Sequence, residues 1–382
     1  MRYQTLTSVF TTAISLSFLA GQPDAVAQNR VRTELPFPDV PGYVTLKCDF
    51  HMHTVFSDGA VWPTVRVEEA WRDGLDVIAI TDHIEYLPHR ADVNTNYGRP
   101  YEIARVTAAP LGIIVIRAAE ITRGEPPGHL NALFLKSIDP LGTPEYRDAV
   151  KAAADQGAFI FWDHPGWKQQ EQKSVWYAEQ GEFYDKGWLK GIEVVNGDRY
   201  DAIAHQWCLD KKLAMVANSD VHGPITWDHD ASEENHRPLT LVFATQRSEE
   251  AIKEALFARR TVLFTGKQLI GEEQLLKPLF GGALEVKNQP LRIKGKDQVM
   301  VQIFNRAPIS FQLENAGKLE EVTVSRNVTL QAGKTSLIEL NGKGSRISGK
   351  RTLALPFRVA NLKTAPDQPL AVELKVDAEF LP

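Results

Sequence analysis

The sequence predicts an α/β barrel followed by a small C-terminal β-sandwich. Up to about residue 270, short apolar runs rich in β-forming residues alternate with helical patterns, as in parallel βαβ units. From about Glu272 onward, short alternating runs are separated by Gly, Asn and Pro turns, which is typical of an immunoglobulin-like sandwich. A chain of 382 residues is long enough for both domains. We assign residues 1–27 to a signal peptide, 28–43 to a linker, 44–270 to the barrel and 271–382 to the sandwich.

The first residues have the pattern of an export signal. Arg2 provides a short basic segment, residues 8–20 form an apolar core, and Ala25-Val26-Ala27 is a small-residue cleavage site before Gln28. The core is shorter than a membrane span requires, and no cysteine follows it to carry a lipid anchor. We therefore expect a periplasmic or secreted protein with no membrane anchor. The alternative is an unstructured N-terminus of a cytoplasmic protein.

Histidines and acidic residues recur where the predicted barrel strands end. His51 and His53 follow the first apolar run and point to the same side, because side chains alternate along an extended segment. In a barrel of parallel strands, reactive groups gather at the carboxyl ends of the strands. Four later runs end in the same way, at Asp82-His83, Glu120, Asp163-His164 and Asp220-Val221-His222.

His129 departs from this pattern because it precedes its apolar run, residues 130–135. A parallel strand would place His129 at the wrong end of the barrel. Residues 123–128, with two prolines and two glycines, have the composition of a tight turn. If this turn forms a hairpin with residues 113–121, His129 returns to the same rim as Glu120.

The candidate ligands exceed what one tetrahedral metal site can use, because a catalytic zinc takes about three protein ligands plus water. A carboxylate such as Glu120 can bridge two cations, and paired cations can activate water and stabilise both oxygens of a phosphoryl displacement. Mixed imidazole and carboxylate ligands suit zinc, manganese or iron. We expect two to three divalent ions of one of these metals. The candidate ligands are His51, His53, Asp58, His83, Glu120, His129, His164, Asp220 and His222.

This ordered set of residues resembles the polymerase and histidinol phosphatase (PHP) superfamily of metal-dependent phosphoesterases, over roughly residues 44–266. The layout is most similar to exported phosphodiesterases of the Sb-PDE type. The resemblance implies a distorted (β/α)7 barrel for this α/β domain. It also implies one metal held by His51, His53, Glu120 and Asp220, a second bridged by Glu120 and completed by His129 and His164, and a third held by Asp58, His83 and His222.

We expect hydrolysis of a small phosphodiester by metal-bound hydroxide, with Glu120, Asp220 and His222 as the catalytic residues. The alternatives are a phosphomonoesterase of the same fold, an amidohydrolase-like enzyme that cleaves C–N bonds, and a non-catalytic metal-binding protein. A net charge of -5 argues against nucleic acid as a scaffold partner, which requires a basic face. The sequence does not indicate the oligomeric state.

Several residues near the predicted rim have two possible roles. Asp82 and Asp163 either orient a ligand imidazole or cap the next element. Arginines after strand ends either clamp a phosphate or form ordinary salt bridges, and tryptophans either wall a pocket for an apolar ester group or pack in the core. The arginines are Arg123, Arg199 and Arg237, and the tryptophans are Trp62, Trp167, Trp176 and Trp188. For the histidines outside the motifs, His89, His205, His229 and His236, we expect surface or hydrogen-bonded positions.

Overall fold

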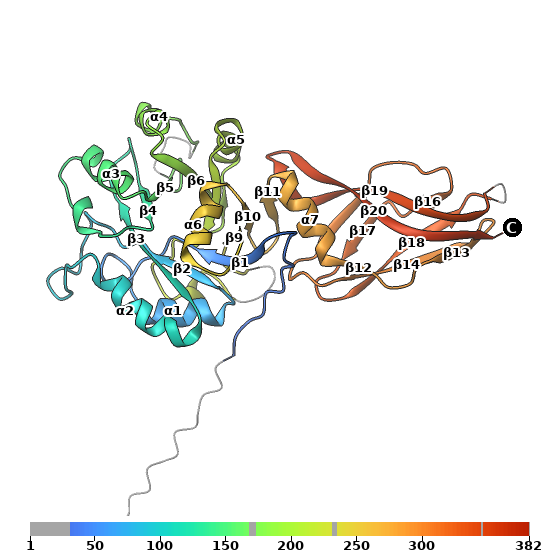
Figure 1. The fold of residues 1–382 in the computed structure, drawn as a ribbon, viewed down its shortest axis with the longest axis horizontal. Helices are drawn as coiled ribbons and strands as arrows, with labels where there is room; N and C mark the ends of the chain where they lie inside the picture. The colour runs from blue at the N-terminus through green and yellow to red at the C-terminus, as the bar shows by residue number, and fades with distance from the viewer. Residues whose placement is uncertain (1–30, 168–172, 231–234, 345–346, 382) are drawn as a thin grey trace, which may run out of the picture. The chain divides into compact units, whose positions relative to one another are not determined.

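The computed structural model describes residues 31–167, 173–230, 235–344 and 347–381 (Figure 1). The predicted signal peptide lies outside these residues. Among the described helices, none has both the length and the apolar character that a membrane crossing requires. The strands of the first domain are β1 (Val44–Asp49), β2 (Val77–Ile80), β3 (Ile114–Ile121), β4 (Leu130–Leu133), β5 (Phe159–Trp162), β6 (Leu189–Asn196), β7 (Arg199–Tyr200), β8 (Ala214–Asn218), β9 (Leu239–Ala244), β10 (Thr261–Phe264) and β11 (Leu269–Gly271).

Helices alternate with these strands, which confirms the predicted mixed α/β domain. Ser248 caps α6, because its side chain accepts a hydrogen bond from the main-chain N–H of Ala251. The helices are α1 (Pro63–Arg72), α2 (Arg99–Ala108), α3 (Tyr146–Asp155), α4 (Ala178–Asp185), α5 (Ala202–Lys211) and α6 (Glu249–Phe257), with short 3-10 turns η1 (Ala109–Leu111), η2 (Asp139–Leu141) and η4 (Ile225–Trp227).

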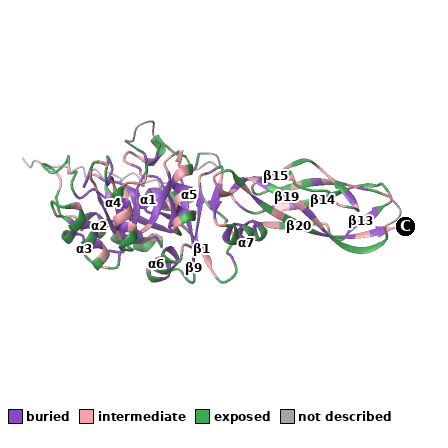
Figure 2. Cartoon of the chain, turned by 90° about the horizontal axis from the view of Figure 1, so that it is seen from above, coloured by how far each residue is buried: buried purple, intermediate pink, exposed green. Residues whose placement is uncertain are grey.

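The barrel sheet runs β9-β1-β2-β3-β4-β5-β6-β8. The pairs β1-β2, β2-β3, β5-β6 and β6-β8 are parallel. β3 and β4 form the antiparallel hairpin that the position of His129 predicts, with Ile121 opposite Leu130, and β4-β5 and β1-β9 are antiparallel as well. The first and last strands of this order, β9 and β8, are joined by side-chain hydrogen bonds instead of main-chain pairing. The hydroxyl of Thr240 on β9 both donates to the carbonyl of Ala217 on β8 and accepts from its N–H, at 2.9 Å each. The barrel strands are mostly buried (Figure 2).

The second domain is a β-sandwich of two antiparallel-dominated sheets. One sheet has the order β12-β14-β18-β16, and the other contains β13, β15, β17, β19 and β20. The strands are β12 (Leu284–Val286), β13 (Leu291–Lys294), β14 (Gln298–Asn305), β15 (Phe311–Asn315), β16 (Val322–Val324), β17 (Asn327–Leu330), β18 (Thr335–Gly342), β19 (Gly349–Ala365) and β20 (Gln368–Leu381). Burial alternates along β13, where Leu291 and Ile293 are buried and Arg292 and Lys294 are exposed, as a sandwich requires.

Helix α7 (Glu273–Ala283) precedes the sandwich and was not predicted from the sequence. Pro278 and two glycines at its end weaken the local helical pattern. Its apolar side chains, including Leu276 and Phe280, are nevertheless buried. Tertiary burial therefore stabilises a helix that local propensity does not indicate.

Candidate metal centre

All nine predicted ligand residues come together at one rim of the barrel, in overlapping groups whose possible ligand atoms lie within 4.8 Å of one another. They follow the carboxyl ends of β1, β2, β5 and β8, lie on β3, or precede the antiparallel strand β4. No predicted ligand is left outside the cluster. The groups are His53, Asp58, His83 and His222; His51, His53 and Glu120; His51, His164 and Asp220; and His83, Glu120 and His129.

Glu120 lies at the middle of the cluster, and its two carboxylate oxygens face different histidines. Oε2 lies 3.0 Å from Nε2 of His51 and 3.2 Å from Nε2 of His53. Oε1 lies 2.5 Å from Nδ1 of His129 and 3.3 Å from Nδ1 of His83. Glu120 is fully buried, and burial alone would raise its pKa, but the histidines around it hold the pKa of the carboxyl well below its ordinary value. A charged carboxylate with one oxygen toward each set of imidazoles has the arrangement that a bridging ligand needs.

Asp220 takes part from the loop after β8. Its Oδ1 lies 3.1 Å from Nε2 of both His51 and His53, so the two histidines of the HxH motif face two carboxylates at once. Asn196 donates to the other oxygen of Asp220 at 3.1 Å and fixes the side chain. Asp220 itself has a left-handed backbone, with φ 53°. This conformation is uncommon outside glycine and asparagine or aspartate, and it turns the loop so that the acid and His222 both reach the rim.

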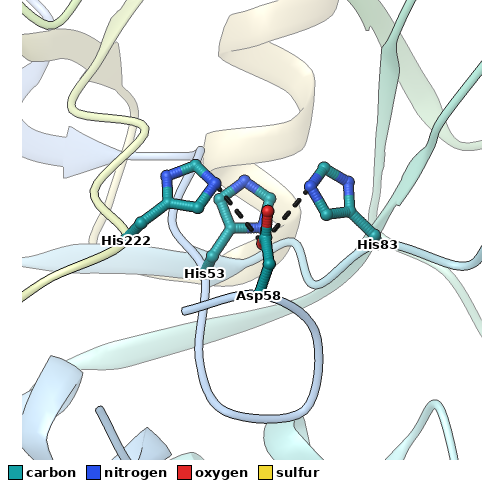
Figure 3. Close-up of side chains that lie close together, drawn as sticks. All are labelled: His53, Asp58, His83 and His222. Carbon is teal, nitrogen blue, oxygen red and sulfur yellow. Dashed lines mark ion pairs between the residues drawn. The ribbon is translucent and has the colours of Figure 1, made fainter. Parts of the chain in front are cut away.

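Figure 3 shows the outer group, in which the His83 and His222 imidazoles stand on either side of Asp58. Oδ1 of Asp58 is 3.4 Å from Nε2 of each of these histidines and 3.8 Å from Nδ1 of His53. The His222 side chain is 41% exposed, whereas that of His53 is fully buried. The cluster therefore opens to solvent on the side of His222.

The buried ligand His164 has the properties of a metal-binding imidazole. Burial lowers its pKa to about 4, so the ring is neutral at pH 7. Its Nδ1 is buried and, among the described residues, has no hydrogen-bond partner. A buried polar atom without a partner is costly, and a coordinated cation removes that cost. The ligand atom of His164 groups with His51 and Asp220, and its ring lies 4.9 Å from that of His129, so its assignment to the second metal stays a prediction.

Sequence reasoning missed Glu193, which lies within β6. Its Oε1 is 3.1 Å from Nδ1 of His51, on the other side of the ring from Glu120. Its oxygens also accept from the side-chain amides of Asn218 and Asn196 and from the N–H of His164, all at 2.9 Å. An acid inside an apolar strand, flanked by Ile192 and Val194, was the available signal.

Asp82 and Asp163, each of which had two possible roles from the sequence, differ in their hydrogen bonding. Asp82 accepts hydrogen bonds from the N–H and hydroxyl of Thr54 and from the hydroxyl of Ser57, at 2.6–2.7 Å, and so fixes the loop that carries Asp58. Asp163 is buried beside His51 and Glu193, and both its oxygens are without a hydrogen-bond partner among the described residues. Burial raises the pKa of Asp163 well above its ordinary value.

Arg66, fully buried on α1, ties together the two loops that carry the HxH and DxH motifs. Its guanidinium donates to the main-chain carbonyl of His53 and to those of residues 221–223, at 2.8–3.1 Å. Glu69 accepts from the same guanidinium at 2.8 Å. Apart from the bond to Glu69, these bonds are made to main-chain groups of segments that carry candidate ligands, so Arg66 positions those residues without touching the cluster itself.

The arginines near the rim are engaged with protein groups. Arg237 is fully buried between Asp49 and Asp73, which makes it a salt-bridge residue. Arg123 pairs with Glu85 and donates to the carbonyl of Thr143. Arg199 donates to the carbonyl of Pro165.

The remaining histidines and tryptophans divide between core and rim. His205 contacts the Tyr200 hydroxyl at 2.9 Å, and both ring nitrogens of His236 contact main-chain carbonyls, so these two are hydrogen-bonded as expected. Trp176 packs against Trp162 and Trp207, and Trp188 packs against Phe183. Trp62 and Trp167 are about half exposed.

The donor set fits divalent cations of intermediate hardness, because imidazoles and carboxylates converge while the described lysines and arginines form no ion pair with Asp58, Glu120 or Asp220. More than one ligand group shares Glu120, which is consistent with a multinuclear centre.

Comparison with known proteins agrees with this geometry. A family model described as an Ig-like domain matches residues 284–375. A two-domain protein from Bacteroides vulgatus ATCC 8482, described as containing a predicted PHP-like metal-dependent phosphoesterase, is 42% identical, with a TM-score of 0.84, over 90% of this chain and 99% of that protein. A search of curated proteins found no match.

Two further solved structures are similar at 17% identity. One is a candidate metal-dependent phosphoesterase from Bifidobacterium adolescentis ATCC 15703, with a TM-score of 0.38 over 55% of this chain and 95% of that protein. The other is an amidohydrolase from Chromobacterium violaceum with bound sulfate and no metal, with a TM-score of 0.37 over 46% of this chain and 88% of that protein.

Proposed function

Because the chain belongs to the family of two-domain proteins with a PHP-like metal-dependent phosphoesterase domain, we propose that it is an exported phosphodiesterase of the Sb-PDE type. The observation that carries the proposal is the position of Glu120, whose two oxygens face two different sets of histidines. A carboxylate in this position would hold two cations, which is the chemistry that phosphoester hydrolysis uses.

We assign the ligands as the family resemblance implies. His51, His53, Glu120 and Asp220 would hold the first ion. Glu120 would also bind the second ion, which His129 and His164 would complete. Asp58, His83 and His222 would hold a third ion. Ions bound there would lower the pKa of a coordinated water and neutralise charge on a phosphate. Glu120 and Asp220 would hold the cations in place, and His222, the most exposed of these residues, would face an entering substrate.

The engaged arginines support a diester over a monoester. A monoester dianion is commonly bound by a guanidinium that makes two hydrogen bonds to the phosphate. Arg123 and Arg237 are instead committed to Glu85, Asp49 and Asp73. A diester carries one negative charge, which the cations can neutralise without such an arginine.

Export is proposed from the pattern of residues 1–27. If it is correct, protein isolated from the periplasm or medium of its host begins at Gln28. An intact Met1 on cytoplasmic protein would contradict export and leave the proposed chemistry unchanged.

The reaction is tested with three substrates on protein loaded with manganese or zinc. Bis(p-nitrophenyl) phosphate and p-nitrophenyl phosphate share a leaving group, and p-nitroacetanilide reports C–N cleavage. We expect the largest kcat/KM for the diester. A larger value for the monoester would identify a phosphatase, and anilide cleavage with no phosphoester cleavage would overturn the proposal.

A further inference from the structure

Exposed aromatic side chains are concentrated on the loops that carry metal-ligand candidates. Single exposed apolar side chains are ordinary on protein surfaces, but most of these aromatic residues lie at a similar short spacing after a candidate ligand. Among the described residues, four of the five exposed aromatic side chains follow a candidate ligand by three to five positions, and only Phe257 on α6 does not. The four are Trp62 after Asp58, Tyr86 after His83, Trp167 after His164 and Trp227 after His222.

Trp167 lies directly against two candidate ligands. Its ring centroid is 5.2 Å from that of His129 and 5.2 Å from that of His164, with its plane at 60° and 65° to theirs. The side chain is still 46% exposed. The turn that places it needs Gly166, which has φ +81° and leaves no room for a Cβ beside Ser174.

Tyr86 lies beside another ligand, His83, at a ring distance of 6.0 Å and an angle of 61°. It is 54% exposed. The chain is fixed just before Tyr86, because the N–H of Ile84 donates to the carbonyl of Glu120 at 3.0 Å and Glu85 accepts from the N–H of Thr122 at 2.7 Å. The backbone that carries the exposed ring is therefore anchored next to the cluster.

One cationic side chain near Tyr86 is already engaged with protein groups. The guanidinium of Arg123 is paired with Glu85 and hydrogen-bonded to the carbonyls of Thr122 and Thr143. A flat apolar group can stack on the exposed ring of Tyr86 or meet it edge to face.

We propose that Trp167 and Tyr86 are specificity-determining residues that bind a flat aromatic group on the alcohol portion of the substrate. This inference rests on the proposed function. It narrows the substrate to phosphodiesters in which the ester group that stays on the phosphate carries an aromatic ring, of either the phenyl or the nucleobase kind. The phosphate binds at the metal centre, and the ring packs against the exposed faces of these two side chains.

The test uses three diesters with the same p-nitrophenyl leaving group and a different second ester group: methyl, phenyl or thymidine 5′-linked. Manganese-loaded wild-type protein is compared with Trp167→Ala, Tyr86→Ala and Trp167→Phe. Phe257→Ala is the matched control, because Phe257 is an exposed aromatic residue on a helix that carries no ligand. Metal content is measured for every variant by elemental analysis.

We expect wild-type kcat/KM to be higher for the phenyl or thymidine diester than for the methyl diester, and each alanine variant to reduce that ratio by roughly three- to tenfold. The loss should appear mainly in KM, with metal content unchanged, because the rings bind ground state and transition state alike. Trp167→Phe should retain most of the ratio. If the alanine variants lose more kcat/KM for the phenyl diester, the site prefers a phenyl ring; if they lose more for the thymidine diester, it prefers a nucleobase.

Equal kcat/KM values for all three diesters, or ratios that the alanine variants and Phe257→Ala change alike, would overturn the inference while leaving a phosphodiesterase. No hydrolysis of any diester by metal-loaded wild-type protein would instead be a failure of the proposed function. An alanine variant that loses metal is replaced in the comparison by the leucine variant at the same position, where a reduced phenyl-to-methyl ratio supports the inference and an unchanged ratio contradicts it.

Discussion

Nδ1 of His51 lies 3.1 Å from Oε1 of Glu193, while Nε2 of the same ring lies 3.0 Å from Oε2 of Glu120. A carboxylate that accepts from one imidazole nitrogen keeps the proton on that side and leaves the other nitrogen free to bind a cation. Glu193 therefore selects the tautomer of His51 and holds its orientation. The side-chain amides of Asn218 and Asn196 hold Glu193 in turn.

Replacing Glu193 should weaken metal binding although Glu193 is not among the predicted ligands. In Glu193→Ala, His51 loses the partner of its Nδ1, and we expect the affinity for the first metal to fall by roughly 10- to 100-fold. Isothermal titration of metal-free protein with Mn²⁺ measures this change. Glu182→Gln, an acid on α4 that pairs with Arg147 and Lys186, is the control and should leave affinity unchanged. Equal affinities for Glu193→Ala and wild type would remove Glu193 from the site.

Loss of the central carboxylate should affect two metals together. Glu120→Gln removes the negative charge between two sets of imidazoles, so the repulsion between neighbouring cations is less compensated. We expect wild-type protein to bind two to three ions per chain, and Glu120→Gln to lose at least two and nearly all activity. Elemental analysis after gel filtration measures the number of ions per chain in the wild-type protein and in Glu120→Gln. Loss of one ion alone would show that Glu120 does not bridge.

Arg66 should control the geometry of the outer ligands through the main chain. Arg66→Met leaves the carbonyls of His53 and residues 221–223 without their buried donor, and also leaves Glu69 without its partner. We expect the free energy of unfolding to fall by about 3–5 kcal/mol, as for other broken buried ion pairs. Urea unfolding monitored by tryptophan fluorescence measures this loss.

A milder change distinguishes positioning from general destabilisation. Arg66→Lys keeps the charge but cannot reach all the carbonyls, so metal stoichiometry should fall at the group of His53, Asp58, His83 and His222. Arg237→Lys changes a second fully buried arginine, one that pairs with carboxylates of Asp49 and Asp73. It should reduce stability without reducing stoichiometry. Equal metal loss in the two variants would show that Arg66 has no special effect on the ligands.

The parts of the site that the sequence predicts are those with a local signal. His51 with His53, and Asp220 with His222, are short motifs at the ends of apolar runs, and the structure places all four in one cluster. His129 required a topological argument, and the antiparallel pairing of Ile121 with Leu130 confirms it. Each of these inferences used only residues near one another in the chain, plus the rule that strand ends meet at one rim.

The parts that could not be predicted depend on contacts between distant segments. Glu193 reaches His51 across 142 positions, and only the packing of the barrel strands brings them together. Arg237 was an equally good candidate for phosphate binding until Asp49 and Asp73 were found around it. Helix α7 depends on buried side chains such as Phe280, whereas its Pro278 argues locally against a helix.

Metal binding should release protons, because the metal-free cluster holds them on its histidines. Burial opposes a charged His83, but the carboxylates of Glu120 and Asp58 outweigh this effect and raise its pKa from 6.5 to about 10. At pH 7 the imidazole is therefore protonated, and a cation must displace that proton to bind. We expect the apparent affinity for Mn²⁺ to rise between pH 6.5 and 9, by up to about tenfold per pH unit for one displaced proton.

The same pKa gives the stability of the metal-free protein the opposite dependence on pH. A raised folded-state pKa makes a stabilising contribution that is fully present below 6.5 and is lost as the pH rises through about 10. Thermal unfolding of metal-free protein should therefore show a falling Tm from pH 6.5 to 10, and His83→Asn should flatten this slope. Titration with Mn²⁺ in two buffers of different ionisation enthalpy counts the protons released at pH 7. A count of zero, together with an affinity that does not change with pH, would show that His83 is already neutral in the metal-free protein.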